Sequence, residues 1–207
     1  MLVAGVLASL PTQANLITGS IWENSGGANG SLSVAQGLLG NRSADVTFLV
    51  NSPIDFDNRT RGDGYTIGGF LASGGAVITG GADGGAAGHT VDNTIFYFTG
   101  QVTVQHGQTF NVTHDDGLQL MIGSTLVVDV PGPTGPSVTT YTWTGASGTY
   151  NFELAYAEVS GPPAVLAVDL PLESAVPEPS TYIAGAMLLL PFGSQGVRKL
   201  RDRLRRA

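Results

Sequence analysis

The chain has 207 residues and a mass of 21.3 kDa, enough for one domain with a substantial core. It contains no cysteine, which excludes disulfides, thiolate catalysis and cysteine-ligated metal sites. The net charge is −7, and because most Lys and Arg residues cluster at the C-terminus, the remainder is strongly acidic and unsuited to binding nucleic acid.

An apolar run, Met1–Leu10, has the length of the hydrophobic region of a secretory signal peptide. Thr12-Gln13-Ala14 follows it and places a small residue directly before Asn15. We therefore predict a signal peptide over residues 1–14, cleaved between Ala14 and Asn15. The positively charged segment of such a peptide is missing, because the first basic residue is Arg42. The alternative is a buried N-terminal strand or helix.

One all-β domain, an antiparallel β-sandwich or jelly roll, is predicted over residues 15–172. Apolar and polar residues alternate with a period of two in many short segments, whereas no useful helical periodicity appears. We expect strands at 45–50, at 94–99 and 101–104 as either one strand or a pair bent around Gly100, and at 109–113, 118–122, 125–129, 150–156 and 166–170.

Glycine- and proline-rich segments separate these strands. Gly123-Ser124 is typical of a two-residue hairpin turn, and the proline-rich segments 131–136 and 160–163 indicate loops. The stretch 74–88 holds seven glycines and predicts a loop or a set of tight turns. The alternating apolar side chains that we expect in the core include Phe110, Val112, Leu120, Phe152, Leu154 and Leu166.

His114-Asp115-Asp116-Gly117 lies between two predicted strands. Adjacent carboxylates repel each other unless a cation or hydrogen-bond donors stabilise them, and Ca²⁺ takes several oxygen ligands. The sequence therefore makes Asp115 and Asp116 candidate ligands of Ca²⁺. The alternative is a solvated β-turn, in which Asp and Gly are common.

The segment from Phe96 to Leu170 resembles the PA14 domain, a β-sandwich found in bacterial toxins, glycosidases and yeast adhesins. The resemblance implies a cis peptide bond between Asp115 and Asp116, and Ca²⁺ bound by these residues that in turn holds sugar hydroxyls. Asp129 and Asn93 are conceivable further ligands. The motifs that carry the resemblance are Phe98-Thr99-Gly100, Thr109–Val112, Asp115–Gly123, Leu126–Asp129, Trp143 and Gly148–Glu158.

No signature of an enzyme appears, so we predict that the chain is not one. His89, His106 and His114 lack the spacing of zinc ligands. Glu153 and Glu158 would face opposite sides of one strand, which is a poor arrangement for a general acid and base. The two tryptophans, Trp22 and Trp143, are expected in the core or at its rim rather than as platforms for sugar stacking.

The C-terminal region, predicted as residues 173–207, has three parts. The motif Pro177-Glu178-Pro179 precedes an uncharged stretch, 182–197, and then a basic tail. This order resembles the PEP-CTERM sorting signal. The resemblance implies a Gram-negative bacterium that makes exopolysaccharide, and processing near the motif by an exosortase in the inner membrane. We expect a transmembrane helix over 182–197, with the tail on the cytoplasmic face; a soluble terminal helix is the alternative.

Three functions remain open from the sequence. The first is an exported, exosortase-processed protein of the cell surface or extracellular matrix whose PA14-like module binds exopolysaccharide or another glycan with Ca²⁺. The second is a structural surface or biofilm matrix protein with no small-molecule ligand. The third is a hydrolase, for which a separate catalytic domain has no room beside the PA14-like region.

Overall fold

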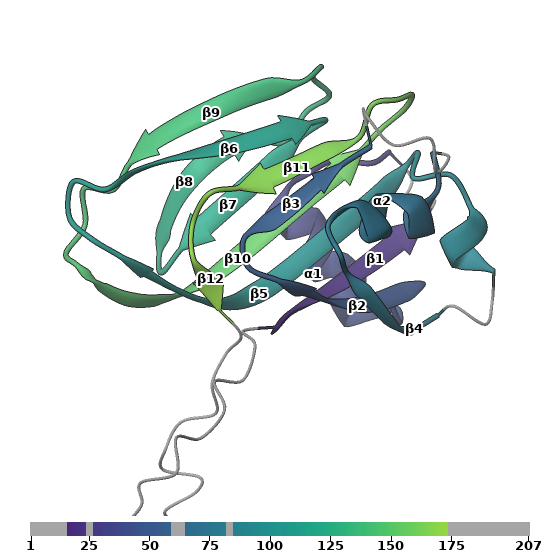
Figure 1. Ribbon diagram of the computed structural model, residues 1–207, viewed down its shortest axis with the longest axis horizontal. Coiled ribbons are helices and arrows are strands. Elements are labelled where there is room, and N and C mark those ends of the chain that lie inside the picture. The colour runs from purple at the N-terminus through teal and green to yellow at the C-terminus, as the bar shows by residue number, and fades with distance from the viewer. Residues whose placement is uncertain (1–15, 24–26, 59–64, 82–84, 174–207) are drawn as a thin grey trace, which may run out of the picture. The chain divides into compact units, whose positions relative to one another are not determined.

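A computed structural model describes residues 16–23, 27–58, 65–81 and 85–173, which form an antiparallel β-sandwich (Figure 1). The larger sheet contains β1 (Leu16–Glu23), β2 (Val46–Asn51), β4 (Val77–Gly80), β5 (Thr94–Val104), β7 (Leu118–Ile122), β8 (Thr125–Val130), β10 (Gly148–Glu158) and β12 (Leu172–Glu173). The smaller sheet contains β3 (Ile54–Asp57), β6 (Thr109–Asp115), β9 (Ser137–Thr142) and β11 (Val165–Val168).

The strand order is β4-β2-β1-β5-β10-β7-β8 in the larger sheet, where β12 also pairs with β5, and β3-β11-β6-β9 in the smaller one. All pairings are antiparallel. The predicted fold class, an all-β antiparallel sandwich, is therefore confirmed for the described residues.

The core lies between the two sheets and is made of the inward-facing side chains that the alternation predicts. Phe48 connects the layers, because its ring centroid lies 5.5 Å from that of Phe98 in the larger sheet and 6.1 Å from that of Phe56 in the smaller one. Edge-on contacts of this kind add to the stabilisation from burial. All six predicted core residues are buried: Phe110, Val112, Leu120, Phe152, Leu154 and Leu166.

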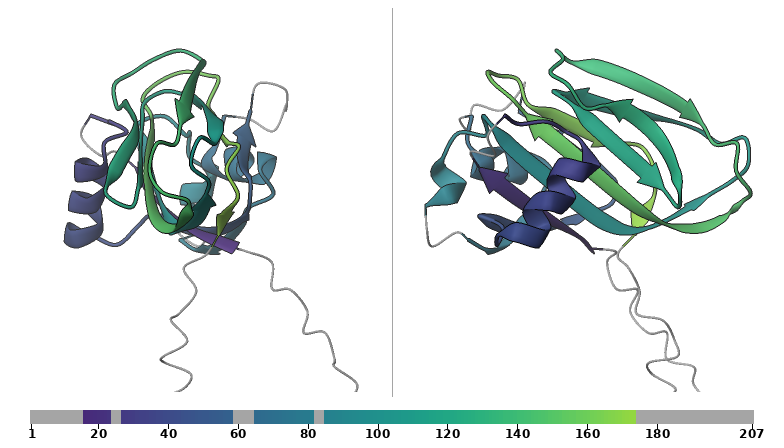
Figure 2. Two further views of the ribbon diagram at one scale, coloured as in Figure 1. Left: turned by 90° about the vertical axis from the view of Figure 1, so that its left-hand side faces the viewer. Right: turned by 180° about the vertical axis from the view of Figure 1, so that it is seen from behind.

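The expectation that the domain contains no helix was wrong. Helix α1 (Leu32–Asn41) lies across the outer face of the larger sheet and covers a second, smaller apolar cluster (Figure 2). The Ser31 side chain caps its first turn. Among its own residues only Leu32 and Ala35 are buried, so the sequence lacks a broad apolar stripe that would reveal the helix.

The glycine-rich region also forms more structure than predicted. Helix α2 (Ile67–Ser73), capped by Thr66, precedes it, and the stretch 74–88 contains β4 and the short 3₁₀ helix η2 (Ala86–Gly88). The predicted loops 131–136 and 160–163 and the turn at Gly123 are confirmed between strands.

Strand β5 runs unbroken through Gly100, so the first of the two predicted alternatives, one strand over 94–104, is confirmed. A Cβ atom at Gly100 would lie 2.1 Å from the carbonyl oxygen of Glu173, so the glycine allows β12 to approach the sheet. Strands β1, β3, β9 and β12 were not predicted. Among the described residues, no helix is long and apolar enough to cross a membrane.

Several predictions for the two ends of the chain lie outside the described residues. They are the signal peptide 1–14 with its cleavage site at Ala14 and Asn15, the motif Pro177-Glu178-Pro179, and the hydrophobic helix 182–197.

Candidate functional site

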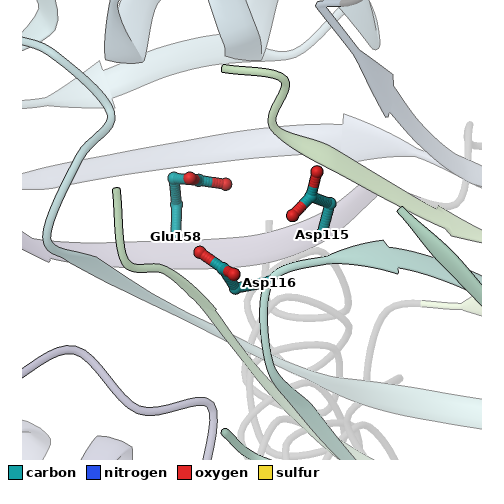
Figure 3. A group of neighbouring side chains, drawn as sticks. All are labelled: Asp115, Asp116 and Glu158. Atoms are coloured by element: carbon teal, nitrogen blue, oxygen red, sulfur yellow. The ribbon is translucent and has the colours of Figure 1, made fainter. Parts of the chain in front are cut away.

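Three acidic side chains meet at one end of the sandwich. Strand β6 ends at Asp115, Asp116 opens the turn into β7, and Glu158 is the last residue of β10. The turn is tied to β10 by two backbone hydrogen bonds, in which the Asp116 N–H donates to the Ala157 carbonyl and the Ala157 N–H donates to the Gly117 carbonyl. Oxygen atoms of the three carboxyl groups consequently lie within 4.8 Å of one another (Figure 3).

The backbone of this turn leaves no space for a side chain on Gly117. A Cβ atom there would lie 2.1 Å from the carbonyl oxygen of Pro131. The same carbonyl accepts a hydrogen bond of 3.0 Å from the Gly30 N–H, which brings a third segment against the turn. The peptide bond between Asp115 and Asp116 is cis, as the PA14 resemblance implies.

Asp116 is held firmly by its neighbours. One carboxyl oxygen accepts a hydrogen bond from the Thr134 N–H at 2.9 Å, and the other accepts one from the Val159 N–H at 2.7 Å. Its carbonyl oxygen accepts a hydrogen bond from Nδ1 of the buried His114 at 2.7 Å. Each carboxylate oxygen has a second lone pair, so these contacts orient the group and leave it able to contact a cation.

Glu158 is fully buried and lies between two tyrosines. The Tyr65 hydroxyl is 2.6 Å from one carboxyl oxygen, and the Tyr156 hydroxyl is 3.1 Å from the other. Burial raises the pKa of Glu158 to about 8; the hydrogen bond from Tyr65 opposes this shift, and the negative charge of Asp116 adds to it. A carboxyl group with this pKa is mostly protonated at neutral pH, and a nearby cation would favour its ionised form.

Two of the acidic residues face an open pocket of about 420 Å³. Asp115 and Asp116 are 6% and 7% exposed, so their oxygens are close to solvent without being immersed in it. The walls come from two loops and offer hydroxyl groups but no basic side chain: Pro133, Thr134, Gly135 and Pro136, and Ser160, Gly161, Pro162 and Pro163.

Asp129, one of the two conceivable further ligands, lies outside the group of three carboxyl groups. The Asp129 carboxylate accepts a hydrogen bond of 2.7 Å from the Gln119 side chain, and the Asn93 side-chain oxygen accepts one of 3.3 Å from the Ala28 N–H. Glu153 lies apart from Glu158, as predicted, with one oxygen 2.6 Å from the Tyr97 hydroxyl.

Glu158 is the site residue that the sequence interpretation missed, although a signal was present. Phe152, Leu154 and Tyr156 alternate on the inward face of β10, and Glu158 continues that alternation. A carboxyl group in phase with buried apolar residues is unusual and marks a candidate site. Trp22 and Trp143 are both buried, which agrees with the predicted core or rim position.

No family model and no curated protein matches the chain. Solved structures do match it. The PA14 sugar-binding domain from an RTX adhesin has 18% identity and a TM-score of 0.56, with 79% of this chain and 99% of that chain covered. The PA14 domain of an antifreeze protein has 19% identity and a TM-score of 0.52, with 78% and 84% covered. The described domain therefore has the PA14 fold.

Proposed function

We propose that this chain is an exported module of the cell surface or extracellular matrix that binds carbohydrate through Ca²⁺ held by Asp115, Asp116 and Glu158. The observation that carries the proposal is the convergence of three buried carboxyl groups within 4.8 Å beside an open pocket. A solvated turn would not need to bury three groups that repel one another.

The chemistry of the three side chains fits Ca²⁺ better than a transition metal. Ca²⁺ takes six to eight oxygen ligands at about 2.3–2.6 Å, so two of its ligand atoms lie at most about 5 Å apart. The group consists of carboxyl oxygens only and contains no imidazole or sulfur ligand. Binding of the ion would replace the proton on Glu158 and neutralise the mutual repulsion of the three charges.

A Ca²⁺ ion bound by these side chains would have positions left for oxygens that enter from the pocket. Sugar hydroxyls are suitable ligands, and the hydroxyls of Thr134 and Ser160 on the pocket walls offer hydrogen bonds to them. Support also comes from the RTX adhesin domain with the same fold, which is described as sugar-binding. The proposal is accordingly for a binding module rather than an enzyme.

Export and sorting rest on the sequence patterns at the two ends of the chain. We propose that a signal peptide, cleaved after Ala14, directs export and that an exosortase in the inner membrane processes the protein near Pro177-Glu178-Pro179. Mass spectrometry of the surface-exposed protein should give a mass that begins near Asn15 and lacks the tail 198–207. Recovery of the intact tail would contradict the sorting proposal.

A structural surface or biofilm matrix protein with no small-molecule ligand is the second candidate. It is favoured by the hydrogen bonds on Asp116, because donors from Thr134 and Val159 already occupy both carboxyl oxygens and give this residue a role in holding two loops together.

A glycan array probed with and without Ca²⁺ separates the two candidates. The wild type should bind a subset of glycans only when Ca²⁺ is present, and the variant Asp115→Asn should lose this signal. Asp129→Asn, which removes an equivalent carboxylate outside the group, should bind as the wild type does. A wild type that binds no glycan in either condition would leave the structural protein as the function.

A further inference from the structure

The two sheets of the described domain end in four edge strands, which are β4 and β8 in the larger sheet and β3 and β9 in the smaller one. An edge strand exposes backbone N–H and C=O groups that can pair with a strand of another molecule. Proteins usually prevent such pairing with charged residues, short strands or bulges.

Three of the four edges carry one of these protective features. Strand β3 has four residues, of which two are Asp55 and Asp57. Strand β4 also has four residues, and its register with β2 is irregular. Strand β8 carries Asp129, and its register with β7 shifts.

Strand β9 has none of these features. Its sequence, Ser137 to Thr142, contains no charge, proline or glycine, and it pairs with β6 in a regular register along its whole length. None of its residues is buried, and Val138 is 63% exposed. Figure 1 shows β9 at the margin of the smaller sheet, with β6 as its neighbour.

Side-chain contacts fix β9 against β6. The Thr140 hydroxyl donates a hydrogen bond of 2.8 Å to the Asn111 side chain, and the Thr142 and Thr109 hydroxyls are 2.9 Å apart. The strand is therefore held extended before any partner arrives, which lowers the entropic cost of pairing.

We propose that β9 is an interaction edge and that it pairs, antiparallel, with β9 of a second copy of this chain. In a pairing centred on Thr140, this residue lies opposite its own copy, and Val138 lies opposite Thr142. These are pairs of β-branched residues, which are favourable across strands.

The absence of charge on β9 favours a second copy of this acidic chain as the partner. Two molecules with a net charge of −7 repel each other over most of their surfaces, so they need an uncharged strip at which to meet. In a two-fold arrangement the residues of a strand face residues of the same strand, and an acidic side chain at the centre would face its own copy. Strand β9 is the edge in the described domain that combines no charge with a regular register.

The pairing would also decide how a dimer places its two glycan-binding pockets; this point, unlike the pairing itself, rests on the proposed function. The loop 131–136 leads into β9 and lines the pocket beside Asp116. Because antiparallel strands run in opposite directions, the two pockets of a dimer would open at opposite ends. Such a dimer would cross-link two glycan chains instead of binding one chain at two places.

Analytical ultracentrifugation of the full chain, without Ca²⁺ or glycan, tests the pairing. The wild-type mass should double as concentration rises, and Thr140→Lys should remain monomeric because two like charges would face each other. Thr79→Lys on β4 is the matched control, since Thr79 is also an exposed edge threonine with a side-chain hydrogen bond, to Thr47 at 3.2 Å. This control should dimerise as the wild type does.

A second pair of variants tests the register and does not depend on a charge. Because the chain has no cysteine, Thr140→Cys introduces a single thiol, which would lie opposite its copy at a distance that mild oxidation can bridge. Most of the Thr140→Cys chains should become covalent dimers, whereas Thr79→Cys should remain monomeric. A wild type that is monomeric at every concentration, a dimer that survives Thr140→Lys, or equal cross-linking at both positions would overturn the proposal.

Discussion

The core between the sheets and the acidic end of the sandwich are buried to a similar degree but have opposite chemistry. Phe48, Phe98 and Phe152 are almost completely removed from water, and so are Asp115, Asp116 and Glu158. Burial of the rings stabilises the fold directly. Burial of the carboxyl groups costs free energy unless hydrogen bonds, a proton or a cation compensate for it.

The difference shows what each region needs from its surroundings. The apolar core needs only close packing, so it forms from the chain alone. At the acidic end, hydrogen bonds offset part of the free-energy cost of burying the carboxyl groups. Backbone N–H groups donate to Asp116, and two tyrosine hydroxyls contact Glu158. The raised pKa of Glu158 shows that this compensation is incomplete without an added cation.

The largest expected effect is the loss of stability when a side chain of the apolar core is truncated. Phe152→Ala should lower the free energy of unfolding by about 3–5 kcal/mol, because it removes a buried ring and leaves a cavity. Urea denaturation followed by circular dichroism measures the change. Val77→Ala, at a largely exposed position on β4, is the control and should change stability by no more than about 0.5 kcal/mol. Equal effects of the two substitutions would show that the register of β10 is wrong.

Addition of Ca²⁺ should stabilise the folded protein through the acidic end of the sandwich, without a change in the apolar core. At one hundred times the dissociation constant, Ca²⁺ should add about 2.7 kcal/mol to the free energy of unfolding and raise the melting temperature. Differential scanning calorimetry measures the shift, and a chelator should reverse it. Asp115→Asn should abolish it. Asp116→Asn is a less clean variant, because an amide NH₂ would face one of the two N–H donors.

A smaller effect should appear in the pH dependence without Ca²⁺. The pKa of Glu158 rises from 4.5 to about 8 on folding, so between these values the folded state binds more protons than the unfolded state. The contribution of Glu158 to the free energy of unfolding is fully present below pH 4.5 and is lost as the pH rises through about 8. Urea denaturation in chelator at several pH values should show this decline in the wild type. If Glu158→Gln retains the same slope, another group is responsible.

The smallest expected effect belongs to a carboxylate outside the group. Asp129→Asn should leave both the Ca²⁺-induced shift in melting temperature and the stability almost unchanged, because Asp129 is exposed and contacts Gln119. Calorimetry with and without Ca²⁺ provides the comparison. Loss of the Ca²⁺ response in this variant would place the cation elsewhere.

Local alternation was sufficient to predict much of the sandwich. Phe110 and Val112 in β6, and Phe152 and Leu154 in β10, face the core because successive residues of a strand point to opposite sides. Helix α1 escaped prediction because its own buried residues are few and small, and its stability comes from packing on a sheet that the local sequence does not describe.

The site was predictable only in part, because one of its three residues is brought there by contacts between segments far apart along the chain. Asp115 and Asp116 are adjacent in the sequence, so their mutual repulsion could be inferred from the residues alone. Glu158 reaches them through the hydrogen bonds between Ala157 and the turn at Asp116 and Gly117, which join segments far apart along the chain. Strand alternation can place Glu158 on an inward face, but only the pairing of strands identifies its neighbours.

Isothermal titration calorimetry of the wild type with CaCl₂ measures directly whether Asp115, Asp116 and Glu158 bind Ca²⁺. We expect one Ca²⁺ per chain, with release of protons at neutral pH as Glu158 loses its proton to bind the ion. Repeating the titration in buffers with different heats of ionisation measures those protons. Asp115→Asn should show no specific heat of binding. A wild type that gives no binding heat, or binding that Asp115→Asn and Glu158→Gln leave unchanged, would contradict the assignment of a Ca²⁺ site to these three residues.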